Sequence, residues 1–222
     1  MKITEIEMEE KPFEYFASLS KDDEALLHKV YELGENYFKD MMFQPESVIG
    51  DFMKVSMKCP GDDEWHTAAI TLPNELEYFT YTWFDFHVEH LDCDGCFDIA
   101  NQTLLIDSAC KDNDNTILHE MIHLHETVLE TLPAYYKETL FIALYWHLRN
   151  LIPDLDEIMK KYGHIYEEDA LTEQGGQHGL LFLLKSFDLD IKKGLPLGTV
   201  MGYGKRTEFE EYTYNTEPCN KQ

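Results

Sequence analysis

The sequence predicts an α+β fold in which short strands come first and helices follow. Short β-branched or apolar runs at 48–57 and 67–72 are separated by proline and glycine turns. From Asn115 onward, the apolar residues instead recur at helical spacing. Strands and helices that are segregated along the chain are typical of an α+β layout rather than an alternating parallel sheet. We therefore expect a small antiparallel or mixed sheet, then an active-site helix, then a helical C-terminal half.

The first half of the chain is expected to contain one helix and several strands. Residues 21–31 begin with acidic side chains and carry apolar ones at i, i+3 and i+4, which predicts an amphipathic helix. Residues 92–96 are typical of a turn, because Asp and Gly dominate between the two cysteines. Strands are expected at 48–57, 67–72, 77–88 and 99–106.

The second half is expected to be helical. Polar residues at 112–115 offer N-caps for the first helix, which Pro133 ends. Pro153 ends the second helix in the same way. The predicted helices span 117–132, 134–151, 154–162 and 178–187.

Charge and composition exclude some functional classes. With 18 Lys+Arg against 43 Asp+Glu, the 222-residue chain has a net charge of −25. Polyphosphate binding depends on clustered Lys and Arg, so direct DNA binding and association with an acidic membrane are not expected. Hydrophobic residues make up 44%, enough for a sizeable core. We predict a single domain over 1–222, with a helical insertion at about 134–163.

The amino terminus and the cysteines indicate a cytoplasmic protein. Residues 1–7 alternate charged and apolar side chains, which is not the pattern of a secretion signal. The most apolar helical stretch, 140–151, is too short to cross a bilayer. Five cysteines are an odd number in a chain large enough to fold without disulfides, which favours a reducing compartment.

His119-Glu120-Met121-Ile122-His123 is an H-E-x-x-H sequence that lies within the helix expected at 117–132. Because an α-helix turns by about 100° per residue, side chains four positions apart project from one face and can reach one metal ion. Glu120 is the natural general base for a water bound to that ion. The surrounding apolar residues place the histidines in a buried or cleft environment, where an unpaired imidazole is costly. We predict one zinc ion per chain at His119 and His123.

A catalytic zinc usually takes three protein ligands and leaves one position for water. His125 points to the opposite side of the helix and is expected to be solvated or satisfied locally. Glu126 returns to the metal-facing side, where it is expected beside the site or at the core edge. His178 is the stronger candidate for the third ligand, because flexible glycines deliver it to the start of an apolar helix.

Two motifs together resemble those of SprT-like zinc metallopeptidases. Residues 118–123 (L-H-E-M-I-H) and 178–182 (H-G-L-L-F) are similar to that family's H-E-M-I-H and H-G-x-x-F pair, and the strand-like 102–107 matches its layout. The resemblance covers roughly 99–187. It implies a zincin-like fold, a zinc ion held by His119, His123 and His178, and Glu120 as the catalytic base.

The chain departs from the family in two respects. The interval between His123 and His178 is longer than the family pattern, and Glu168 or Glu173 as third ligand would make the site resemble that of a gluzincin. The DNA-binding parts of family members that act on DNA-bound proteins have no counterpart after Phe187.

Cys93 and Cys96 form a single C-x-x-C, which is a weak signal for a zinc ribbon without a second pair. A redox motif of the thioredoxin type needs a helix start, whereas Asp-Gly favours a turn. Ordinary turn cysteines are therefore the favoured interpretation.

We thus predict a zinc-dependent metallopeptidase that hydrolyses peptide bonds, with Glu120 as general base on a zinc-bound water. The expected partner is a polypeptide, and the negative charge favours a basic one. One alternative is a non-proteolytic zinc metalloprotein, either another amide hydrolase or a structural zinc site; another is an acidic interaction module with an inactive site. The oxyanion-stabilising residue stays open among Tyr166, Tyr203 and Tyr212.

Overall fold

A computed structural model describes residues 11–38, 47–49, 52–57, 66–71, 84–131, 134–161, 178–202 and 204–216, with backbone alone for the strands between 47 and 71. The fold is mixed α+β with mostly helical content, as the sequence predicted. Glu168, Glu173, Tyr166 and Tyr203 lie outside the described residues. No helix in the described segments is both long and apolar enough to cross a membrane.

Local sequence signals mark the start of α2 (Lys21–Tyr37) and the end of α6 (Leu180–Lys193), although α2 extends beyond the predicted 21–31 and α6 beyond the predicted 178–187. Ser20 caps the second helix by accepting a hydrogen bond from the Asp23 amide over 3.1 Å. Gly194 ends the sixth helix with a φ of 67°, which glycine adopts at little cost. The helices are α1 (Phe13–Ala17), α2 (Lys21–Tyr37), α3 (Asp114–Thr131), α4 (Ala134–Leu151), α6 (Leu180–Lys193) and α7 (Arg206–Phe209), and residues 155–161 are also helical.

Two three-stranded sheets account for the described strands. The first is antiparallel and contains β1 (Ser47–Ile49), β2 (Phe52–Met57) and β3 (His66–Thr71), so the strand expected at 48–57 is a hairpin. The second contains β4 (Asp85–Glu89), β5 (Gly95–Asp98) and β6 (Thr103–Asp107) in the order β4-β6-β5. It is mixed, because β4 pairs parallel and β5 antiparallel to β6.

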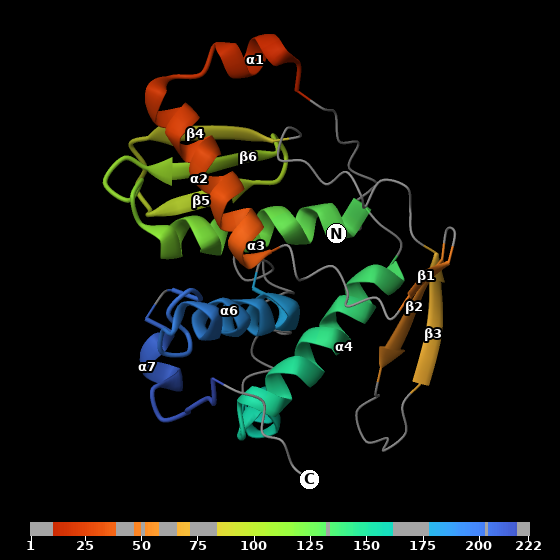
Figure 1. The fold of residues 1–222 in the computed structure, drawn as a ribbon. Coiled ribbons are helices and arrows are strands. Elements are labelled where there is room, and N and C mark those ends of the chain that lie inside the picture. Colours follow the sequence, from red (N-terminus) through yellow and green to blue (C-terminus); the bar gives the residue numbers. More distant parts are fainter. Residues whose placement is uncertain are drawn as a thin grey trace.

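The mixed sheet and the helices stack in layers, with α3 in the middle (Figure 1). Helix α2 packs on β4, and α3 packs on β5 and β6; since α2 and α3 also contact each other, they cover the same face of the sheet. Helices α4 and α6 pack on α3 from the other side. The segment predicted as a helical insertion therefore contributes α4 to the same core.

Asp114 fixes the start of α3 between helices α2 and α6. Its carboxylate lies 2.9 Å from Lys29 Nζ of α2 and 3.2 Å from Lys193 Nζ of α6. An acidic side chain also complements the positive end of the α3 dipole. One residue thus ties together helices α2, α3 and α6.

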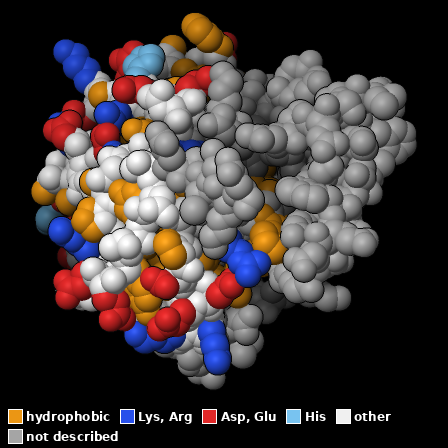
Figure 2. All heavy atoms as spheres, turned by 60° about the horizontal axis from the view of Figure 1, so that its bottom comes forward, with side chains coloured by type: hydrophobic (Ala, Val, Ile, Leu, Met, Phe, Trp, Pro, Cys, Tyr) orange, Lys and Arg blue, Asp and Glu red, His pale blue; other side chains and the backbone are white. Residues whose placement is uncertain are grey.

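Charged side chains of both signs are interspersed on the face of the molecule in Figure 2. Among the described residues of that face, Lys and Arg do not gather into an extended basic patch.

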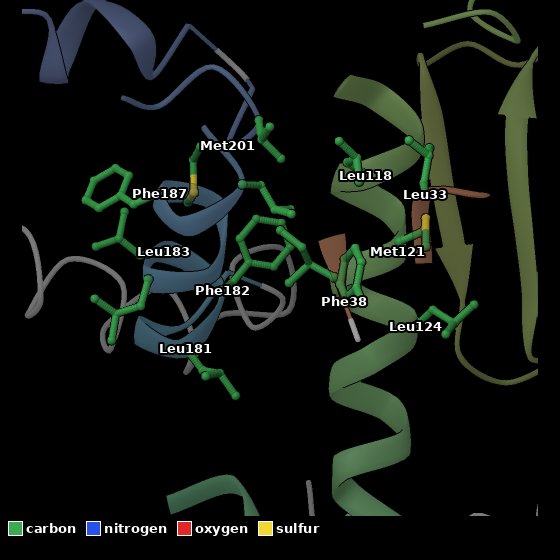
Figure 3. Packing of buried hydrophobic residues seen from close by; sticks show 14 of the residues in the cluster. Leu33, Phe38, Leu118, Met121, Leu124, Leu181, Phe182, Leu183, Phe187 and Met201 are labelled. Atoms are coloured by element: carbon green, nitrogen blue, oxygen red, sulfur yellow. The ribbon is translucent and has the colours of Figure 1, made fainter. Parts of the chain in front are cut away.

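Helices α3 and α6 face each other through buried apolar side chains (Figure 3). Leu118 and Met121 of α3 are at most 1% exposed, and Phe182 points from α6 toward α3 and is fully buried. Because α3 lies between a sheet and two helices, residues 117–125 are all buried. The apolar surroundings predicted for the H-E-x-x-H sequence are confirmed.

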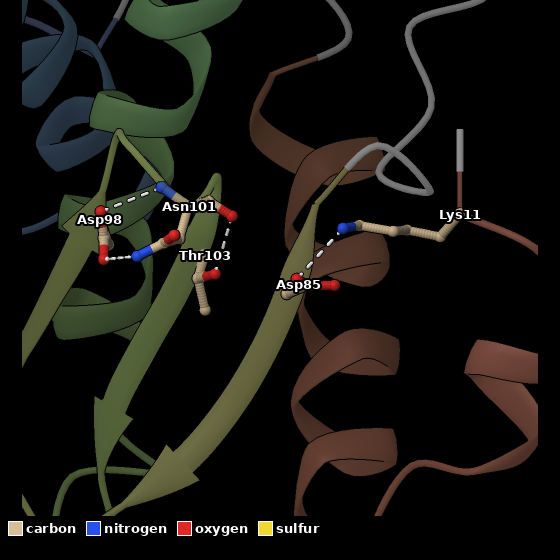
Figure 4. Close-up of polar contacts among 5 residues, drawn as sticks. All are labelled: Lys11, Asp85, Asp98, Asn101 and Thr103. Carbon is tan, nitrogen blue, oxygen red and sulfur yellow. Dashed lines mark hydrogen bonds and ion pairs between the residues drawn. The ribbon is translucent and has the colours of Figure 1, made fainter. Parts of the chain in front are cut away.

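The strand expected at 99–106 is wrong in its first half. Asp98 accepts hydrogen bonds from the amides of Ala100 and Asn101 and from the Asn101 side chain, at 2.7 to 3.1 Å (Figure 4). These bonds fold 99–102 into a tight turn between β5 and β6. In the same view, Lys11 pairs with Asp85 at 3.1 Å and joins the segment before α1 to β4.

Candidate metal centre

Helix α3 presents His119 and His123 together. Asn113 caps its first turn, accepting a hydrogen bond from the Asn115 amide over 3.1 Å. The two imidazoles lie one turn apart, with ring centroids 5.2 Å from each other, and both are under 10% exposed. The helix and the shared face predicted for these residues are therefore confirmed.

His178 joins this pair from the residue before the α6 N-cap, Gly179. Its Nε2 atom lies 3.1 Å from Nε2 of His119. The nearest nitrogens of the three rings all lie within 4.8 Å of one another. Two nitrogens bound to one tetrahedral zinc ion at ideal distances are about 3.3 Å apart, so the spacing of His119 and His178 fits a shared ion.

Phe182 lies against all three imidazoles. Its ring centroid is 4.8 Å from that of His119 and 4.6 Å from those of His123 and His178. Phe182 lies in the first turn of α6, packs beside the His178 ring and fills the space between α6 and α3. The phenylalanine of the H-G-x-x-F motif thus fixes the orientation of the histidines.

A backbone carbonyl sets the tautomer of His119. Its Nδ1 atom is 3.0 Å from the carbonyl oxygen of Val200, which can only accept. Nδ1 therefore carries the hydrogen, and Nε2 keeps its lone pair for a metal ion. The buried carboxylate of Asp190 holds this loop, accepting bonds from the amides of Val200 at 2.9 Å and Thr199 at 3.2 Å.

Burial keeps the three histidines neutral. Desolvation lowers the pKa of His119 and of His123, and it lowers the pKa of His178 to about 4. The neighbouring His119 and Lys205 lower the pKa of His178 further. Neutral imidazole is the form that binds metal. Two buried imidazoles and one partly buried imidazole, all neutral and with converging nitrogens, are a donor set that fits a divalent ion such as zinc.

Glu120 faces the sheet beside this cluster. Its side chain is 4% exposed and accepts a hydrogen bond from the Phe97 amide of β5. Burial raises the pKa of Glu120 to about 8, although the Phe97 bond opposes the shift. The fit against β5 is tight, because a Cβ atom on Gly95 would lie 3.1 Å from Glu120 Cγ. A carboxyl group with a perturbed pKa next to three potential metal ligands is typical of a catalytic site.

No family model, curated protein or solved structure matches the chain. The function must therefore be argued from the site itself.

Three other residues considered for the site from the sequence lie in surroundings unlike those of the three histidines. His125 is 7% exposed and lies against Phe38, with ring centroids 5.7 Å apart, so the expectation of a solvated side chain is wrong. Glu126 is half-buried at the core edge, and burial raises its pKa to about 7. Tyr212 is buried with Lys161 Nζ 5.9 Å from its ring centroid.

The residues that support His119 carry no signal in the sequence. Val200 acts through its backbone carbonyl, which every residue has, so no side-chain pattern marks it. Asp190 stands among the charged residues at the end of α6, and only its complete burial and its bonds to the loop distinguish it.

Proposed function

We propose that the chain is a zinc-dependent metallopeptidase in which Glu120 is the general base. The observation that carries this proposal is the convergence of His119, His123 and His178 on one point, with Glu120 on the same helix as two of them. Three nitrogen ligands leave a fourth position for water or substrate, as in catalytic zinc sites. When bound, the ion supplies Lewis acidity that polarises the scissile carbonyl and makes a water easier to deprotonate.

A zincin-like fold of the SprT type agrees with this arrangement. A mixed sheet precedes α3, which carries H-E-x-x-H, and α6 begins just after the third histidine. Phe182 contributes to the site, as expected if the H-G-x-x-F resemblance is functional. We propose this fold type and this family likeness on the motifs and on the order of the elements.

Glu120 is placed to move the proton. Its buried carboxyl group is held by the Phe97 amide, so its orientation is fixed before substrate arrives. A pKa of about 8 without a cation favours the protonated form near pH 7, whereas a nearby dication favours the carboxylate. The charged carboxylate then accepts a proton from the attacking water and passes it to the leaving amine.

The edge of β5 favours a peptide over another amide. The Asp107 amide donates to the Asp94 carbonyl, so by antiparallel alternation the paired residues of β5 are Asp94, Cys96 and Asp98. The backbone groups of Gly95 and Phe97 point away from β6, toward the edge of the described sheet. There the Gly95 carbonyl accepts from Cys93 Sγ and the Phe97 amide donates to Glu120, so the Gly95 amide and the Phe97 carbonyl are the groups that an added strand would pair with. An extended polypeptide can align beside this edge, next to Glu120. The net charge favours a basic polypeptide and disfavours DNA.

The test is to separate metal binding from hydrolysis. Purified protein is expected to contain one zinc ion per chain and to cleave fluorogenic peptides, with Lys- and Arg-rich ones cleaved best. Glu120→Gln should keep the zinc ion and reduce turnover by at least about a thousandfold. Glu130→Gln is the matched control, because Glu130 lies on the same helix but is exposed. Undiminished turnover in Glu120→Gln, or protein that binds no zinc, would contradict the proposal.

A further inference from the structure

The turn that leads into β5 brings two thiols together. Cys93 is exposed and Cys96 is partly buried, and the Cys96 thiol hydrogen-bonds with Cys93. Cys93 Sγ also donates to the Gly95 carbonyl over 3.4 Å. The described cysteines are all free thiols. The bend at 92–94 turns the Cys93 side chain back over the start of β5, as its contact with the Gly95 carbonyl shows. The C-x-x-C spacing is the one that redox-active cysteine pairs use.

The surroundings of the two thiols assign them different roles. Cys93 meets solvent, so an oxidant reaches it first. Burial raises the pKa of Cys96 to about 11, and the neighbouring Cys93 and Glu120 raise it further. A thiol with a high pKa stays protonated near neutral pH, so Cys96 is not the thiol that an oxidant attacks first.

The same turn touches Glu120. Gly95 stands between the cysteines in the chain, and a Cβ there would lie 3.1 Å from Glu120 Cγ. Phe97, the residue after Cys96, donates its amide hydrogen to the Glu120 carboxylate. Any change in the backbone between Cys93 and Phe97 therefore moves the groups that hold Glu120.

We propose that Cys93 and Cys96 form a reversible intramolecular disulfide that regulates the site by shifting β5 against Glu120. The regulatory effect rests on the proposed function, whereas the formation of the disulfide does not. The oxidant is a peroxide. The Cys93 thiolate attacks one oxygen of hydrogen peroxide, the O–O bond breaks, and Cys93 sulfenic acid and hydroxide form. Cys96 then attacks the Cys93 sulfur, the S–S bond forms, and the hydroxyl group leaves as water with the Cys96 proton.

Electrons and atoms balance in both directions. Each thiol gives up one electron to the peroxide, which is reduced to two water molecules once the hydroxide takes up a proton. A dithiol such as dithiothreitol reverses the reaction by thiol–disulfide exchange, and its own two sulfurs become the disulfide.

Disulfide mapping tests the chemical step. The zinc-loaded full chain is treated with hydrogen peroxide, digested and fragmented in a mass spectrometer. Two thiols should disappear, with a loss of two hydrogens between Cys93 and Cys96, and dithiothreitol should restore them. Cys110→Ser should behave like the wild type, whereas Cys93→Ser should form no intramolecular disulfide. Pairing of Cys93 with another cysteine, or its oxidation only to sulfinic acid, would overturn the proposal.

Peptide hydrolysis in the two redox states tests the regulatory step. Oxidised wild type should turn over about ten- to a hundredfold more slowly than reduced protein, and Cys93→Ser should be insensitive to peroxide. Zinc content is measured in parallel and should not change, because the disulfide acts on Glu120; loss of zinc or unchanged turnover on disulfide formation would overturn the regulatory effect. If the disulfide forms but neither state hydrolyses peptides, the proposed peptidase function fails while the cysteine pairing stands.

Discussion

The Nδ1 atom of His119 lies 3.0 Å from the Val200 carbonyl oxygen, across a separation of 81 residues in sequence. This bond leaves Nε2 of His119 directed at the other two imidazoles. The Val200 amide in turn donates to Asp190 Oδ1 over 2.9 Å. The orientation of a potential metal ligand therefore depends on a buried carboxylate that does not touch it.

Asp190→Asn should weaken zinc binding about 10- to 100-fold, because an amide nitrogen replaces one oxygen that accepts from the loop. The measurement is competition with a chromophoric chelator at neutral pH. Asp154→Asn, an exposed change just after α4, is the control and should bind zinc like the wild type. Equal affinities for the two variants would show that the loop holds its position without Asp190.

His178→Ala should weaken zinc binding more strongly than Asp190→Asn, because it removes a nitrogen within 4.8 Å of both α3 imidazole nitrogens. We expect a loss of at least about a thousandfold, since it leaves a site with two protein ligands. The same chelator competition measures it, with the exposed His147→Ala as the matched control. An affinity unchanged by His178→Ala would point to Glu168 or Glu173 as the third ligand.

Gly95→Ala should destabilise the fold by about 1 to 3 kcal/mol, because the added methyl group meets Ile106 Cδ1 at 3.0 Å and Glu120 Cγ at 3.1 Å. It should also reduce peptide hydrolysis, since the easiest relief is to push Glu120 away from β5. Urea unfolding and turnover are both measured. For stability, Gly179→Ala is the comparison, because a Cβ there meets nothing within 4 Å. Equal stability losses in the two variants would argue against a tight contact at Gly95.

Local sequence signals are sufficient to predict the elements whose ends they mark. Helix α4 spans Ala134–Leu151 as predicted, because Pro133 and Pro153 restrict the chain on both sides of it. The helical spacing of His119 and His123 fixes their shared face without any tertiary contact. The same local reasoning placed a strand across 99–102, where the Asp98 carboxylate instead stabilises a turn.

Long-range packing determines the features of the site that local sequence patterns do not predict. His125 is buried because Phe38, just after α2, and Lys185 of α6 both approach it, and neither is near it in sequence. The choice of His178 rested on the glycines and the apolar helix around it, whereas its 3.1 Å approach to His119 depends on how α6 packs on α3. Residues that support a ligand through the backbone, such as Val200, become visible only once the helices are packed.

Glu126→Gln should stabilise the fold at pH 8 and leave it nearly unchanged at pH 4.5. Burial raises the pKa of Glu126 in the folded chain from 4.5 to about 7, so the folded state holds this proton more tightly than the unfolded state. The stabilisation from the protonated group is complete below pH 4.5 and is lost as the pH rises through about 7. Glutamine keeps the neutral shape at every pH, and the gain at pH 8 should be on the order of 1 kcal/mol for this partly exposed side chain.

Urea unfolding of both proteins at pH 4.5, 6 and 8 measures the effect of Glu126→Gln. Glu130→Gln is the control, because Glu130 is an exposed carboxylate on the same helix that pairs with Lys137. It should show no gain at pH 8, since removing its charge only breaks that ion pair. A gain for Glu126→Gln that is equal at all three pH values would show that the substitution acts through packing rather than through the buried charge.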